Sequence, residues 1–128
     1  MGKVIGLGGV FIKAKDHKAL ANWYEQNLGI GFSGGTYAVM PFDGEGGKSS
    51  AGYNIVSISP WDTAYFEPSV KHFMINLRVE DMDGLLEELK KKGVEMVGDP
   101  LNEEYGKFAW IMDPEGNKVE LWEPPSGE

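Results

Sequence analysis

Apolar and polar positions alternate most clearly near the end of the chain, in two runs on either side of Asp113-Pro114-Glu115-Gly116. Proline suits the second position of a tight turn and glycine tolerates a positive φ, so residues 107–124 predict a β-hairpin closed by Asp113 and Asn117. The facing pairs are then aliphatic on one side (Ile111–Val119, Ala109–Leu121) and aromatic on the other (Trp110–Glu120, Phe108–Trp122). The aliphatic side is typical of packing on a helix. The aromatic side indicates either one wall of a ligand-binding pocket or a hydrophobic core with Glu120 at its solvent-exposed edge.

Two earlier stretches each predict a strand followed directly by a helix. Residues 8–15 alternate, and Asp16 then takes the N-cap position of a helix that ends at Gly29. The same pattern returns over residues 72–93, where Asp81 is the N-cap. The remaining predicted segments are strands at 36–42 and 52–59, a loop at 43–51 and an irregular connector at 60–71. The aromatic side chains of the connector could cover the core, a ligand or a partner subunit.

The two halves superimpose at a constant offset of 65 residues, which matches Asp16 with Asp81, and each half ends in a hairpin built on Asp-x-Glu-Gly. We therefore predict an α+β fold in which two βαβββ modules, related by an internal repeat, form a curled mixed sheet around a cleft with the helices outside. One domain is expected over residues 1–128, made of module one at 4–59, the connector at 60–71 and module two at 72–124.

Composition and charge narrow the function. A hydrophobic content of 41% and a charged content of 25% are typical of a soluble globular protein, and no signal peptide or membrane-spanning run is visible, so we expect a cytoplasmic location. The net charge of −8 argues against nucleic acid and membrane partners and permits a cationic ligand. Without cysteine, a metal site would need histidine or oxygen ligands.

Three stretches, GGVFIKAKDHKALANWYEQNLGI, MINLRVEDMDGLLEELKKKGV and YGKFAWIMDPEGNKVELW, carry a family resemblance over nearly the whole chain. The sequence resembles the glyoxalase / bleomycin resistance / extradiol dioxygenase superfamily, which has the vicinal oxygen chelate fold. The resemblance implies paired βαβββ modules and a homodimer. It also implies that enzymes of this type hold a divalent metal, such as Zn²⁺, Ni²⁺, Mn²⁺ or Fe²⁺, with His or Glu on four central strands.

Carried over position by position, the metal ligands of the family are largely missing. They fall on Gly9, on Met74 and on Glu120, while the strand at 52–59 offers no His, Asp or Glu. One strong ligand of four is too few for such a metal, so no metal is expected. His72 could join Glu120 in an unusual site or could simply lie at the surface.

Alternation along the predicted strands, with the repeat, places the candidate ligand-binding side chains on one concave face: Phe11, Met40, Phe42, Met74, Asn76, Phe108, Trp110, Glu120 and Trp122. Thioethers and aromatic rings suit an adaptable pocket for flat apolar ligands or cations. Glu120 could be a counter-ion for a cation, a general base in catalysis or a structural relic of a metal site. These residues could also be ordinary core.

The leading hypothesis is a metal-free small-molecule-binding protein of the bleomycin resistance type, with an aromatic or cationic amphipathic ligand. The first alternative is a metal-dependent lyase of glyoxalase type or a dioxygenase that uses Glu120. The second is a degenerate module that binds a partner protein. The sequence leaves open whether the protein is an enzyme.

Overall fold

The structure is a computed structural model that describes residues 2–42 and 52–125. Nine elements follow one another along the chain: β1 (Lys3–Ala14), α1 (His17–Leu28), β2 (Tyr37–Pro41), β3 (Tyr53–Pro60), β4 (Phe73–Glu80), α2 (Met82–Lys91), β5 (Leu101–Glu103), β6 (Gly106–Met112) and β7 (Lys118–Glu123). The strands form one seven-stranded mixed sheet in the order β2-β3-β1-β4-β7-β6-β5. The predicted loop at 43–51 lies outside the described residues.

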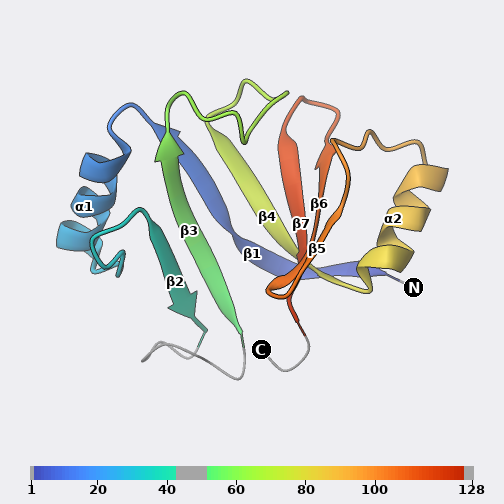
Figure 1. Cartoon of the computed structure of the whole chain (residues 1–128), viewed down its shortest axis with the longest axis horizontal. Helices are drawn as coiled ribbons and strands as arrows, with labels where there is room; N and C mark the ends of the chain where they lie inside the picture. The colour runs from blue at the N-terminus through green and yellow to red at the C-terminus, as the bar shows by residue number, and fades with distance from the viewer. Residues whose placement is uncertain (1, 43–51, 126–128) are drawn as a thin grey trace.

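The sheet is built from two halves that meet where β1 pairs with β4 in antiparallel fashion. In the first half β1 pairs with β3 in parallel, and in the second half β4 pairs with β7 in the same way. Figure 1 shows α1 and α2 at opposite ends of the sheet, with the middle strands between them. The predicted α+β fold, with its repeat, curled mixed sheet and outer helices, is therefore confirmed.

Each helix packs on its own half through a separate apolar cluster. Ala21 of α1 packs with Phe32, Ala38 and Ile58 in the first half. In the second half Met82 and Leu86 of α2 pack on the aliphatic side of the β6–β7 hairpin, which comprises Ala109, Val119 and Leu121 with Ile111 beside them. The two clusters hold the outer face of the sheet against the helices, and the opposite face is left to form a cavity.

The hairpin has the predicted register. Trp110 pairs with Glu120 and Ile111 with Val119. The turn is closed by the Asp113 amide, which donates to the Asn117 carbonyl at 2.9 Å, and Gly116 has a φ of 83°, which a residue with a side chain rarely adopts. The turn therefore sets which side chains share a face.

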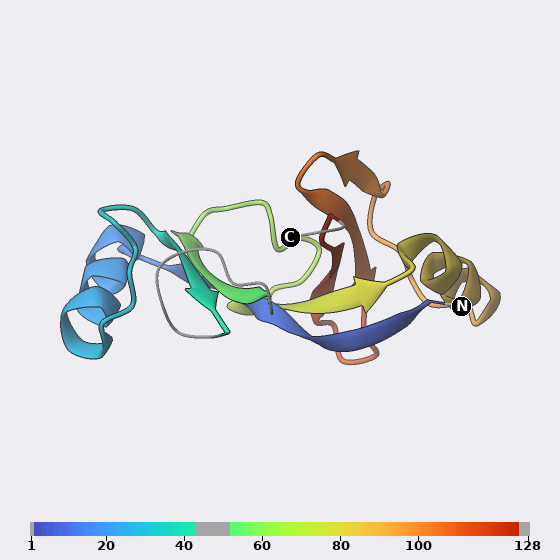
Figure 2. The ribbon, with the colours of Figure 1, turned by 90° about the horizontal axis from the view of Figure 1, so that it is seen from below.

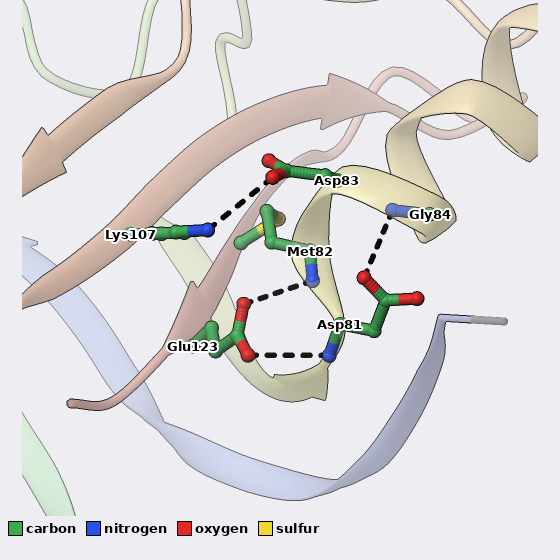
Figure 3. A network of polar contacts seen from close by, with 6 residues as sticks. All are labelled: Asp81, Met82, Asp83, Gly84, Lys107 and Glu123. Carbon is green, nitrogen blue, oxygen red and sulfur yellow. Dashed lines mark hydrogen bonds and ion pairs between the residues drawn. The ribbon is translucent and has the colours of Figure 1, made fainter. Parts of the chain in front are cut away.

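The start of α2 is tied to the last strand (Figure 3). The Glu123 carboxylate of β7 accepts hydrogen bonds from the backbone amides of Asp81, at 3.2 Å, and Met82, at 2.9 Å. Asp81 in turn accepts from the Gly84 amide, as predicted for an N-cap. These bonds satisfy amides that a helix leaves without partners, and they fix α2 relative to β7.

Candidate functional site

A cavity of about 420 Å³ opens on the concave face of the sheet. Figure 2 shows β6 and β7 rising from the sheet on the same side as the connector between β3 and β4. Eight of the twelve lining residues are aromatic, and the full set is Phe11, Tyr37, Tyr53, Ile55, Tyr65, Asn76, Leu101, Tyr105, Phe108, Trp110, Glu120 and Trp122. Such a wall suits a flat apolar ligand, because the rings offer stacking faces.

Glu120 is the charged residue of this lining, and its side chain is held by three donors. The Tyr65 hydroxyl and the Trp110 indole N–H, the latter at 2.9 Å, both donate to its Oε1. The Asn76 amide donates to Oε2 at 2.5 Å. Glu120 is only 2% exposed, so these bonds replace the water that would otherwise solvate the carboxylate.

The charge of Glu120 affects the cavity tyrosines. The pKa of Tyr65 is raised well above its usual range, first because burial disfavours the phenolate and second because Glu120 repels it. The pKa of Tyr37 is also raised, by burial, by Tyr53 and by Glu120. Both phenols are therefore neutral hydrogen-bonding groups at physiological pH.

Two cations of the protein lie against the aromatic wall without lining the cavity. The Lys118 ammonium lies over the Tyr65 ring at 5.3 Å, and burial lowers its pKa while the charge of Glu120 opposes that change. The Arg78 guanidinium lies 4.9 Å from the Trp122 ring and 5.5 Å from the Tyr53 ring. These contacts demonstrate that the ring faces here accommodate positive charge.

Six of the nine residues that the sequence places on the concave face line the cavity: Phe11, Asn76, Phe108, Trp110, Glu120 and Trp122. Met40, Phe42 and Met74 do not. Tyr37 lines the cavity, so Met40, three residues further along β2, falls on the opposite face, and Phe42, just beyond β2, lies against Arg78. Met74 pairs with Phe11 and is 1% exposed, which places it in the core.

The sequence prediction missed the remaining lining residues: Tyr37, Tyr53, Ile55, Tyr65, Leu101 and Tyr105. Alternation along residues 52–59 groups Tyr53 with Ile55 on one face of the strand, but it does not show which face lines the cavity. Tyr65 lies in the connector, where no periodicity assigns a face. Its ring stacks on Phe11 at a centroid distance of 5.8 Å and meets Trp110 edge-on at 6.2 Å, so Tyr65 is part of the cavity wall.

Strand pairing aligns one residue from each of the four central strands in a row that includes Gly9 and Glu120, two of the positions matched to metal ligands of the family. The pairing aligns Ile55 with Gly9, Gly9 with Asn76, and Asn76 with Glu120. Met74, which the constant offset matches with Gly9, pairs with Phe11, and Asn76 is the β4 residue of this row. In this antiparallel pair the residues that the repeat matches do not face each other, because Gly9 pairs with Asn76 and Phe11 pairs with Met74.

The residues of this row do not fit a divalent metal. Both Glu120 oxygens already accept hydrogen bonds, and a β-carbon at Gly9, the β1 residue of the row, would lie 2.1 Å from the Ile55 carbonyl oxygen. His72 packs on Trp61 with a ring separation of 4.5 Å and does not line the cavity. Within residues 2–42 and 52–125, no three His, Asp or Glu side chains come together as a metal-binding group.

A second hollow, of about 400 Å³, lies between α2 and the β5–β6 hairpin. Its lining mixes acidic and basic side chains, among them Lys107, which forms an ion pair with Asp83 at 3.3 Å (Figure 3). It lacks both the buried carboxylate and the cluster of rings. The cavity around Glu120 is therefore the better candidate for a binding site.

Comparisons with known proteins agree with the fold. The family model described as "Glyoxalase/Bleomycin resistance protein/Dioxygenase superfamily" matches residues 6–121. No curated protein matches the sequence. No helix among the described residues is long and apolar enough to cross a membrane.

Several solved structures are similar in fold. A methylmalonyl-CoA epimerase in complex with methylmalonyl-CoA and NH4+ has a TM-score of 0.69 at 17% identity, covering 98% of this chain and 99% of that one. Methylmalonyl-CoA epimerase from Mycobacterium tuberculosis has a TM-score of 0.59 at 22% identity, covering 95% and 89%. A structure from Legionella pneumophila titled as an NAD-dependent benzaldehyde dehydrogenase has a TM-score of 0.60 at 14% identity, covering 91% and 98%. At such identities the likeness concerns the fold alone.

Proposed function

The chain belongs to the glyoxalase/bleomycin resistance protein/dioxygenase superfamily, and from that premise we propose that it binds a flat, cationic aromatic small molecule in the cavity around Glu120, without a bound metal. The observation that carries the proposal is a buried carboxylate set among eight aromatic side chains that line one cavity. Rings of this kind stack on a planar ligand, and the carboxylate supplies the matching charge.

The preference for a cation follows from the charges of the lining. Glu120 is negative, and none of the twelve lining residues is a lysine or an arginine. A cation that enters this cavity gains attraction to Glu120 and to the ring faces, whereas an anion meets repulsion.

The absence of a metal in the proposal rests on the donor set. Glu120 is held by O–H and N–H donors, and its neighbours in the row are Asn76, Gly9 and Ile55, of which only the amide of Asn76 could be a ligand. In this row the metal-dependent lyase and the dioxygenase therefore lack the ligands that their metal chemistry needs. No reaction is derived for them.

The homodimer implied by the family is retained in the proposal. Apolar side chains on the outer face of the middle strands are exposed, including Leu7 at 53%, Phe73 at 59% and Ile75 at 43%. Neither helix covers this region of β1 and β4 (Figure 1). Light scattering after size exclusion should give the mass of two chains, and the mass of one chain would remove the dimer from the proposal.

A pair of ligands with the same ring system and opposite charge tests the binding proposal. Calorimetric titration at neutral pH should detect binding of protonated 1-naphthylmethylamine and at least tenfold weaker binding of 1-naphthalenesulfonate. Glu120→Gln should weaken binding of the amine about tenfold, because it removes the negative charge. Glu87→Gln, an exposed change on α2, is the matched control and should leave binding unchanged. Equal binding of both ligands, or of neither, would contradict the proposal.

A further inference from the structure

We propose that Tyr65 is a built-in competitor for Glu120, and that a ligand with a cationic N–H group reaches the carboxylate by displacing the Tyr65 hydroxyl. This inference rests on the proposed function and adds the step by which the site opens. It makes Tyr65 a residue that sets affinity and selects for a charged hydrogen-bond donor.

Glu120 is enclosed, and its Oε1 atom is shared by two donors. Tyr65 and Trp110 donate to Oε1, Asn76 donates to Oε2, and the residue is 2% exposed. Oε1 already accepts two hydrogen bonds, so a ligand N–H group can bond to that atom only where Tyr65 or Trp110 is displaced. The enclosed carboxylate would lose stability without a replacement donor, so displacement and ligand bonding must occur together.

Of the three donors to Glu120, Tyr65 is the one that can be displaced. Trp110 and Asn76 stand on strands β6 and β4, and each pairs directly with Glu120 in the sheet. Moving either side chain would disturb a position fixed by the strand ladder and by neighbouring packing. Tyr65 instead comes from the irregular connector and is 39% exposed, so its ring has solvent to move into.

The Tyr65 side chain can move while the connector stays in place. The Tyr65 carbonyl accepts a hydrogen bond from the Lys118 ammonium at 2.6 Å. The next residue, Phe66, is 1% exposed and anchors the segment in the core. Rotation of the phenol about its side-chain bonds therefore opens Oε1 without unfolding residues 60–71, and such rotations are fast for exposed side chains.

The chemical class of the ligand follows from this competition. A neutral hydroxyl that replaced the phenol would exchange one similar hydrogen bond for another and gain little. A protonated amine or amidine gains a charge-assisted bond of roughly twice the strength, which outweighs the lost phenol contact. A quaternary ammonium ion has no N–H and would bind with Tyr65 still in place.

The experiment compares two ligands and two matched tyrosine variants by calorimetry. The ligands are protonated 1-naphthylmethylamine and its N,N,N-trimethyl derivative, which keeps the ring and the charge but has no N–H. The variants are Tyr65→Phe, which removes the competing hydroxyl, and Tyr24→Phe, which removes a hydroxyl on α1, outside the cavity lining. Each variant loses a single oxygen atom and keeps its ring, so the apolar packing is retained.

We expect Tyr65→Phe to tighten binding of the amine about tenfold, because the amine no longer has to break the hydrogen bond between Tyr65 and Glu120. Binding of the trimethyl derivative should change less than about twofold. Tyr24→Phe should change neither by more than about twofold. If wild type binds the amine and Tyr65→Phe leaves its affinity unchanged or weaker, this inference fails while the proposed function stands. If neither wild type nor Tyr65→Phe binds the amine, both fail.

Discussion

At the scale of single residues, the arrangement around Glu120 makes a graded prediction about stability. Glu120→Ala leaves the donors of Tyr65, Trp110 and Asn76 without an acceptor and should lower the free energy of unfolding by roughly 2–4 kcal/mol. Glu120→Gln should cost less than about 1 kcal/mol. The Asn76 Oδ1 atom is buried without a hydrogen-bond partner, and a turned Asn76 amide would let this oxygen accept from the new glutamine.

Urea unfolding of the two variants measures this difference. Glu103→Ala, at an exposed position of β5, controls for the loss of a glutamate as such and should be within about 0.5 kcal/mol of wild type. Equal losses for Glu120→Ala and Glu120→Gln would mean that the charge, and not the set of hydrogen bonds, stabilises this part of the molecule.

The cavity tyrosines predict a loss of stability at alkaline pH. The folded-state pKa of Tyr65 is raised above the ordinary value of 10.0, so the unfolded chain releases this proton first. The contribution of this pKa difference to the free energy of unfolding is fully present below about pH 10 and declines as the pH rises further. Chemical unfolding followed from pH 8 to 11 should show this decline, with a smaller slope in Tyr65→Phe. Comparison of the two proteins cancels the opposite contribution of Lys118, whose pKa is lowered by burial.

An unchanged slope in Tyr65→Phe would show that Tyr65 does not keep its proton preferentially in the fold. The hydroxyl would then not be held by Glu120, and the competition proposed above would lose its basis. Tyr37→Phe separates the two phenols, since the pKa of Tyr37 is raised mainly by burial and does not depend on a hydrogen bond to Glu120.

At the scale of the elements, the contact between β7 and α2 predicts a stability effect far from the cavity. Glu123→Ala removes the acceptor for the Asp81 and Met82 amides and should lower the free energy of unfolding by about 0.5–2 kcal/mol (Figure 3). Glu87→Ala removes an exposed ion pair with Lys91 and should cost less than about 0.5 kcal/mol. Ligand binding should be unchanged in both, and a cost for Glu123→Ala no larger than for Glu87→Ala would contradict the capping role.

The elements also show why some parts of the site could be predicted and others could not. The β6–β7 hairpin was predicted residue by residue because its turn fixes the register, and so Trp110, Glu120 and Trp122 were placed on one face. The face of β2 depends on where the strand begins after an irregular turn, so Met40 was assigned to the wrong side. Tyr65 could not be assigned at all, because its position depends on tertiary contacts of the connector and not on any repeat.

At the scale of the whole molecule, the internal repeat accounts for the cavity and its chemistry. Pairing β1 with β4 joins two similar halves into one curled sheet, which brings Gly9 and Asn76 together at its centre. The repeat predicted this architecture, but matching Gly9 with Met74 did not predict that strand pairing places Asn76 beside Glu120. The resulting row presents one carboxylate and one amide, a pattern suited to binding an organic cation and not to chelating a metal.

The central claim, a metal-independent binding cavity, is tested most directly by one calorimetric comparison. Tag-free protein treated with a chelator and then dialysed is titrated with protonated 1-naphthylmethylamine, before and after addition of Zn²⁺, Ni²⁺, Mn²⁺ or Fe²⁺. The account predicts one ligand per chain with the same affinity, within about twofold, in every case. Binding that appears only with a metal, and is lost again on chelation, would contradict it.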